Sequence, residues 1–198
     1  MNRDELLQAT KKQLTPARWE HTLRVADTAV RLAKRVKIDP DRAEIAAILH
    51  DYCKFWPDNE LISWIKTCHL PPDLLSYNKE LWHAPVGAEV ARKEWDIEDE
   101  DILNAIRYHT TGRPRMSELE KIIFLADYIE PGRRFPGVDR VRELAESDLD
   151  QAVLQALNNT IIFLIERGQK VYPLTLLARN DMLDQVKRNE MRLREESI

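Results

Sequence analysis

The chain has 198 residues, of which 43% are hydrophobic and 32% charged, and it contains only five glycines. This length suits one domain with its own core, and so few glycines disfavour a turn-rich β fold. The formal net charge of -4 leaves no excess of basic side chains to neutralise a phosphate backbone, which excludes nucleic acid as a partner. We therefore expect a single helical domain over residues 1–198, with its core at about 15–180.

The cysteine content and the distribution of apolar residues predict the cellular compartment. Cys53 and Cys68 are too few for a disulfide framework and do not have the spacing of a zinc-binding set. Residues 1–5 are not followed by the apolar segment of a secretion signal, and no run of about 18 apolar residues occurs. These patterns predict a cytoplasmic protein with no membrane partner.

Helix start signals recur along the first half of the chain. Thr15-Pro16 combines an N-cap residue with a first-turn proline, and apolar residues follow at helical spacing to about residue 37. Asp39-Pro40 repeats this signal before an apolar run that ends at His50-Asp51. Further helices are expected at about 59–67, from Pro85 to about 95, and over 99–109.

The second half begins with a capping box and ends in a charged helix. Ser117 and Glu120 introduce an apolar helix that contains Asp127. A long helix at 148–167 stops at Gly168, and a loop at 169–175 leads into a last helix, which runs into the charged tail at 187–198. Seven to nine helices and no strand predict an all-α bundle with loops at the helix ends.

Several candidate metal ligands lie near the ends of these helices or interrupt apolar runs. The histidines are His21, His50, His83 and His109, and the carboxylates are Asp51 and Asp127. Asp127 stands inside the apolar run 122–129, where a carboxylate is costly to bury without a cation. Imidazole and carboxylate ligands together suit iron, manganese, zinc or cobalt. The joint pattern indicates a metal site.

The pair His50-Asp51 can hold one ion from two sides, because neighbouring helical side chains project about 100° apart. Lys54 follows one turn later and could meet an anionic substrate. For any one histidine, a hydrogen-bonded place in the core is the more common role. Asp127 could instead form an ion pair with Arg133 or Arg134.

The order His21, His50-Asp51, Asp127 resembles the HD superfamily of metal-dependent phosphohydrolases, whose fold is a helical bundle. Longer motifs resemble its bacterial YqeK-like branch, the symmetrical bis(5'-nucleosyl)-tetraphosphatases. These motifs are His50–Lys54, Leu81–Ala88, Ile106–Gly112, Ala126–Arg133, Phe135–Asp139 and Tyr172–Thr175. The resemblance implies that the enzyme cleaves diadenosine tetraphosphate into two ADP. It also implies that the site binds a product such as ADP or a GDP-like nucleotide, and that the metal is iron.

The resemblance also implies a role for each matching residue. Iron, as Fe2+ or Fe3+, would be bound by His21, His50, Asp51 and Asp127, and Mn2+, Co2+ or Zn2+ are other candidates. His83 and His109 would either hold a second metal, bridged by Asp51, or contact phosphate, and either histidine could act as a general acid.

Substrate contacts follow from the same resemblance. Lys54, Thr110 and Arg133 are implied as phosphate contacts beside the metal ligands. Tyr172-Pro173-Leu174-Thr175 is implied as a loop that closes on the nucleoside. His69 and Arg134 are assigned no role, and His69 is expected in packing or at the surface.

Other functions use the same pattern. Another HD nucleotidase or nucleoside triphosphate hydrolase would share the metal site, and a sensor would bind metal and nucleotide without turnover. A purely structural adaptor would leave a buried Asp127 unexplained. Trp64 and Trp82 could mark a homodimer surface, although core packing accounts for them equally well.

Overall fold

The computed structural model describes residues 2–195, which form ten α-helices, two short 3-10 helices and no strand. The α-helices are α1 (Arg3–Gln13), α2 (Pro16–Val36), α3 (Pro40–Leu49), α4 (Asp58–Thr67), α5 (His83–Glu94), α6 (Glu100–Tyr108), α7 (Glu118–Ile129), α8 (Val138–Ala145), α9 (Leu149–Glu166) and α10 (Pro173–Glu195). The 3-10 helices are η1 (Pro72–Ser76) and η2 (Lys79–Leu81). The all-α prediction is confirmed.

Side-chain caps begin the helices that the sequence predicts. The Thr15 side chain accepts a hydrogen bond from the backbone N–H of Arg18 at the start of α2. The Ser117 and Glu120 side chains form the complete capping box of α7. These contacts span three residues, which is why the sequence alone reveals them.

The predicted number of helices was too low within the described residues, because α1 and α8 were missed. Helix α1 buries only Leu6 and Thr10, so its apolar pattern is weak. Helix α8 follows Gly137, whose φ of 87° lies in the left-handed region and which offers no side-chain cap. Helix α5 begins at His83, two residues before the predicted start at Pro85.

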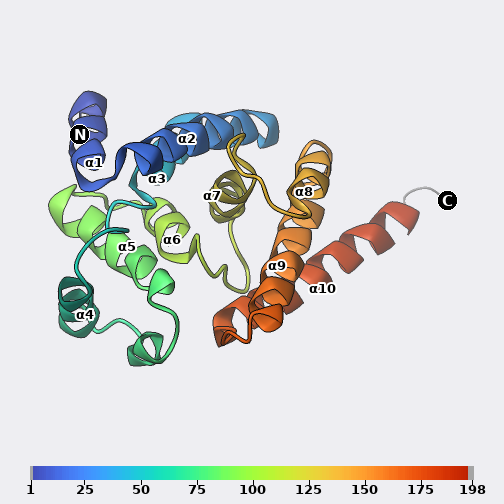
Figure 1. Ribbon diagram of the computed structural model, residues 1–198. Coiled ribbons are helices and arrows are strands. Elements are labelled where there is room, and N and C mark those ends of the chain that lie inside the picture. The colour runs from blue at the N-terminus through green and yellow to red at the C-terminus, as the bar shows by residue number, and fades with distance from the viewer. Residues whose placement is uncertain (1, 196–198) are drawn as a thin grey trace.

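Helix α7 lies at the centre of the molecule (Figure 1) and packs against α2, α3, α6, α8 and α9. Its side chains Ile122, Ile123 and Leu125 are fully buried. Burying each such side chain contributes roughly 1.5–3 kcal/mol relative to leaving it in water. This central helix therefore positions Asp127 between the N-terminal and C-terminal helices, where its side chain is 18% exposed and not fully buried, whereas the sequence predicts a buried carboxylate.

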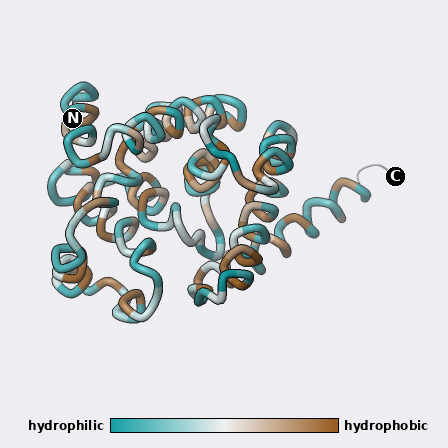
Figure 2. Tube along the Cα trace, viewed as in Figure 1, coloured by the Kyte–Doolittle hydropathy of each residue, from teal (hydrophilic) through white to brown (hydrophobic). Residues whose placement is uncertain are grey.

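Helices α9 and α10 pack against each other, and α10 extends away from the other helices toward the C-terminus (Figure 1). Figure 2 shows hydrophobic segments at the end of α9 that meets the start of α10. The exposed apolar side chains in this part of the chain are Ile162, Phe163, Ile165, Leu176 and Leu177. Residues 187–195 of the charged tail continue α10, and residues 196–198 lie outside the described residues.

The tryptophans that could have marked a homodimer are partly buried against the core. The indole N–H of Trp82 donates to the Leu74 carbonyl at 2.9 Å. Neither Trp64 nor Trp82 is an exposed aromatic surface, so the homodimer stays a prediction. Among the described helices, none combines the length and apolar character needed to cross a bilayer.

Candidate active site

Five helices and one turn bring the predicted metal ligands together. His50 and His109 are the residues that directly follow α3 and α6, and His83 is the first residue of α5. His21 and Asp127 lie on α2 and α7, and Asp51 follows His50 in a turn. The relative exposure of both His50 and Asp51 is 0%. His50 and Asp51 thus lie just beyond the end of α3, at the most buried part of the cluster of histidines and aspartates.

The two carboxylate oxygens of Asp51 face different histidines. Its Oδ2 atom lies 2.9 Å from Nε2 of His50 and 3.8 Å from Nε2 of His21. Its Oδ1 atom lies 3.0 Å from Nε2 of His83 and 3.8 Å from Nε2 of His109. Asp51 therefore connects a His21–His50 side of the cluster to a His83–His109 side.

Two overlapping groups of side chains have the geometry of a metal site. The first is His21, His50 and Asp127, the second is His50, Asp51 and His109, and within each group the candidate ligand atoms lie within 4.8 Å of one another. Nε2 of His21, Nε2 of His50 and Oδ1 of Asp51 are buried without a hydrogen-bond partner among the described residues. Unpaired buried polar atoms are rare because they are costly, and cations bound by these two groups would satisfy them.

Hydrogen bonds at Nδ1 direct the other ring nitrogen of three histidines into the cluster. Nδ1 of His50 donates to the Ala47 carbonyl at 2.6 Å, and Nδ1 of His109 donates to the Ile106 carbonyl at 2.8 Å. Carbonyl oxygens only accept, so these Nδ1 atoms carry the proton and Nε2 presents a lone pair. Nδ1 of His21 donates to Oε1 of Glu130 at 3.1 Å. Such partners orient metal-binding histidines in proteins.

The electrostatics of the cluster keep its carboxylates ionised and His109 neutral. Burial alone would raise the pKa of Asp51, but the adjacent His50 and His83 hold that pKa well below its usual range. Burial lowers the pKa of His109 well below its ordinary value, and the neighbouring His50 and His83 lower it further. Ionised carboxylate and neutral imidazole are the protonation states that bind metal.

Glu130 is a buried carboxylate behind His21. Besides His21 it accepts from Nε of Arg24 at 2.5 Å and from the backbone N–H of Gly132 at 2.5 Å. Burial raises its pKa, but these donors, Arg24 first, lower it to about 2. A Cβ atom at residue 132 would lie 2.6 Å from Nη2 of Arg24, so a side chain here would displace the Arg24 guanidinium from Glu130. Glu130 is thus held as an anion against His21.

Cationic side chains surround the cluster. The Arg18 guanidinium forms an ion pair with Oδ2 of Asp51, and the Arg133 guanidinium forms one with Oδ1 of Asp127. Nζ of Lys54 lies 2.6 Å from Oε2 of Glu80. The sequence offered two roles for Asp127, an ion pair with an arginine or membership of the metal cluster. The structure shows both sets of contacts, because Asp127 pairs with Arg133 and lies among the histidines.

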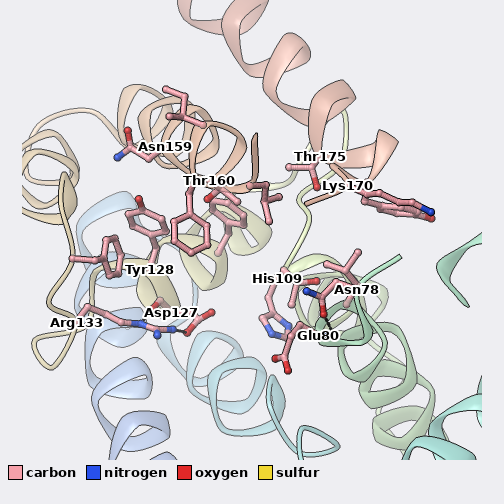
Figure 3. A pocket seen from close by; sticks show the side chains of 18 of the residues that line it. Asn78, Glu80, His109, Asp127, Tyr128, Arg133, Asn159, Thr160, Lys170 and Thr175 are labelled. Atoms are coloured by element: carbon pink, nitrogen blue, oxygen red, sulfur yellow. Dashed lines mark hydrogen bonds and ion pairs between the residues drawn. The ribbon is translucent and has the colours of Figure 1, made fainter. Parts of the chain in front are cut away.

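A pocket of about 720 Å³ opens above the cluster. Figure 3 shows His109 and Asp127 at one end of it, with Tyr128 and Asn159 on one side and Lys170 and Thr175 on the other. Lys54, Thr110 and Arg133 also line the pocket, and the Thr110 hydroxyl has no hydrogen-bond partner among the described residues. Polar donors thus lie around the cluster, and apolar side chains lie farther out.

The model of the HD domain matches residues 18–132, which contain all of these histidines and both aspartates. Two proteins named "Bis(5'-nucleosyl)-tetraphosphatase, symmetrical" are similar over most of their length. The Bacillus subtilis protein is 54% identical over 91% of this chain and 97% of its own, and the Halalkalibacterium halodurans protein is 53% identical over 92% and 98%. The chain belongs to the HD domain family, in the branch of the symmetrical bis(5'-nucleosyl)-tetraphosphatases.

A solved structure confirms the fold of this HD domain. A Clostridium acetobutylicum protein, described as a predicted HD superfamily hydrolase involved in NAD metabolism, is 42% identical. It superposes with a TM-score of 0.89 over 93% of this chain and 98% of its own. The helical bundle that the resemblance implied is therefore the observed fold.

In the structure of this HD domain, some of the predicted substrate contacts line the pocket and others do not. Tyr172 and Thr175 line the pocket, whereas Pro173 and Leu174 do not. The segment is not a loop as predicted, because Pro173 begins α10 and suits the first turn of a helix. Lys54 reaches the pocket from a turn in which its N–H donates to the Asp51 carbonyl at 2.9 Å, since α3 has already ended.

Two charged residues beside the cluster were missed from the sequence. Arg18 lies one turn before His21 on α2, and Glu130 lies three residues after Asp127, so helical spacing could have pointed to both. The pocket walls formed by Tyr128, Phe135 and Phe163 carry no comparable local signal. His69 is exposed, as the sequence allowed, and Arg134 is also exposed.

Proposed function

We propose that this chain hydrolyses diadenosine tetraphosphate symmetrically to two ADP, at the cluster centred on Asp51. The observation that carries the proposal is the continuous pocket, which joins the His/Asp cluster to cationic side chains and then to aromatic walls. A dinucleoside polyphosphate has the matching order of groups: a polyanion in the middle and a nucleoside at each end. The close relatives named for this activity support the same substrate.

We propose His21, His50, Asp51 and Asp127 as the ligands of one metal ion, with iron as the ion in the native protein. The unpaired Nε2 atoms of His21 and His50 support this assignment, because with Asp127 they fit an imidazole-carboxylate donor set. Oδ2 of Asp51 lies beside them, 2.9 Å from Nε2 of His50. When bound, such a cation supplies Lewis-acid chemistry and acidifies water at neutral pH.

The residues around the cluster position the tetraphosphate for attack by water. Lys54, Arg133 and the free Thr110 hydroxyl hold nonbridging oxygens and stabilise the charge that develops on them. Water adds to a phosphorus second from one nucleoside, and the bond from that phosphorus to the central bridging oxygen breaks. One ADP leaves through that oxygen, the other carries the oxygen of water, and the proton passes to solvent. No side-chain nucleophile is required.

The direct test is product analysis with metal-loaded protein. Protein purified without chelators and supplied with Fe2+ or Mn2+ should convert diadenosine tetraphosphate to ADP alone, as read by chromatography. The His50→Ala variant should bind less metal and lose turnover. AMP with ATP as products would contradict symmetrical cleavage. Metal and nucleotide binding without turnover would identify a sensor, and faster hydrolysis of nucleoside triphosphates would identify another HD nucleotidase.

The metal-to-protein ratio separates two roles of His83 and His109. Nε2 of His83 lies 3.2 Å from Nε2 of His109, and both approach Oδ1 of Asp51. Two ions per chain by elemental analysis would assign these histidines to a second metal bridged by Asp51. One ion per chain would assign them to the phosphate groups.

Glu130 provides a test of how His21 is held. Glu130→Gln keeps the shape of the side chain but removes the negative charge of the carboxylate that accepts hydrogen bonds from His21 and Arg24. We expect metal affinity to fall by about 10- to 100-fold, the usual effect of losing such a partner, measured by competition with a chelating dye. Glu143→Gln is the matched control, because the Glu143 side chain is 67% exposed and pairs with Arg140 away from the cluster. Equal metal affinity in both variants would contradict the role of Glu130.

A further inference from the structure

The pocket has two aromatic walls, one on each side of the His/Asp cluster. One wall contains Tyr172, whose ring meets Tyr77 edge to face with centroids 4.9 Å apart. The other contains Tyr128, whose ring meets Phe135 in the same way, also at 4.9 Å. Figure 3 shows Tyr128 opposite Thr175 and Lys170, with His109 between the two sides and Asp127 below Tyr128 in this view.

The wall at Tyr128 continues along the last turns of α9. Ile162 and Phe163 line the pocket and are 53% and 49% exposed. The Arg167 guanidinium lies 4.5 Å from the centroid of the Phe163 ring. Neither the candidate metal ligands nor the phosphate contacts lie on this part of the pocket. An exposed apolar surface that continues an active-site pocket is typical of a surface that binds a ligand.

The proposed substrate has two identical nucleosides, one for each wall. The central bridging oxygen lies midway along the tetraphosphate. Two phosphate groups therefore separate it from each nucleoside. The two walls lie on opposite sides of the cluster (Figure 3), so an extended tetraphosphate can bring one nucleoside to each of them. Aromatic side chains bind bases of either purine type by stacking, since every base has a π face.

We propose that the wall formed by Tyr128, Phe135, Ile162 and Phe163 is the subsite for the second nucleoside of the substrate. The first nucleoside then lies against Tyr172, and the tetraphosphate passes between the two walls along Lys54 and Arg133. This inference rests on the proposed function and adds the part of the molecule that recognises the second half of the substrate.

The test compares two substrates that differ only in the second nucleoside. Diadenosine tetraphosphate has two nucleosides, whereas adenosine 5'-tetraphosphate has one. Phe163→Ala should reduce the ratio of kcat/KM for the first substrate to kcat/KM for the second by about 10- to 100-fold, the loss expected for one base stack. Phe163→Tyr keeps an aromatic ring and should retain the wild-type ratio. Phe163 is half exposed, so its truncation leaves the core intact.

Ile165→Ala is the control, because Ile165 is 63% exposed on the same helix and does not line the pocket. It should leave both substrates unaffected. An unchanged ratio in Phe163→Ala, or an equal loss on both substrates, would overturn the second subsite while leaving the proposed function intact. Failure of the wild-type chain to release ADP from diadenosine tetraphosphate would overturn the proposed function and this subsite together.

Discussion

Asp51→Ala should purify without metal and should lose more than about 1,000-fold of its activity on diadenosine tetraphosphate. The two carboxylate oxygens of Asp51 reach both halves of the histidine cluster. Loss of the ion removes Lewis-acid stabilisation worth several kcal/mol in the transition state, which corresponds to a rate factor of at least that size. Elemental analysis and product chromatography measure the two effects on the same preparation.

The Asp51 variant needs a fold control, because its side chain is fully buried and pairs with Arg18. Asp51→Asn keeps the volume and should also lose metal, and circular dichroism should show native helix content for it. Asp58→Ala is a matched surface control, since Asp58 is exposed and pairs with Lys79. An Asp51→Asn protein that is folded and fully active would refute the assignment of Asp51.

Lys54→Ala should retain its metal and lose about 100- to 1,000-fold in kcat. Lys54 lines the pocket, and its ammonium pairs with Glu80. A bound substrate phosphate would replace Glu80 as the partner of this ammonium. Removing one preoriented donor to a developing oxyanion has an effect of this size in other hydrolases. Lys79→Ala removes an exposed lysine that pairs with Asp58 outside the pocket, and it should have wild-type kinetics. Unchanged activity in Lys54→Ala would exclude the phosphate contact.

The sequence predicts most helices well because their signals are local. Thr15-Pro16, Asp39-Pro40 and the Ser117 capping box act over two or three residues and are confirmed. Helix α8 could also have been predicted, because Val138, Val141 and Ala145 recur at helical spacing and are buried. It was missed because its first residue follows a glycine that offers no side-chain cap.

The candidate ligands could be proposed from the sequence because each is a polar residue within or beside an apolar run of a predicted helix. His50-Asp51 ends a buried helix and is itself fully buried, so burial without compensation would be too costly. Asp127 interrupts the apolar run of α7, although its side chain keeps 18% exposure. The number of ions at the cluster could not be predicted in the same way. It depends on how Asp51 divides its oxygens between His50 and His83, which lie on different helices.

The sequence by itself determined the all-α class, the main helix boundaries and the family, through caps, helical spacing and short motifs. Only the tertiary structure decided which groups meet. His21 and Glu130 are 109 positions apart in sequence, yet their side chains form a hydrogen bond. The aromatic walls of the pocket likewise combine Tyr128 of α7, Phe163 of α9, and Phe135 and Tyr172, which precede α8 and α10. Local hydrogen bonds set where a helix begins, whereas such contacts arise only when the whole set of helices packs around α7.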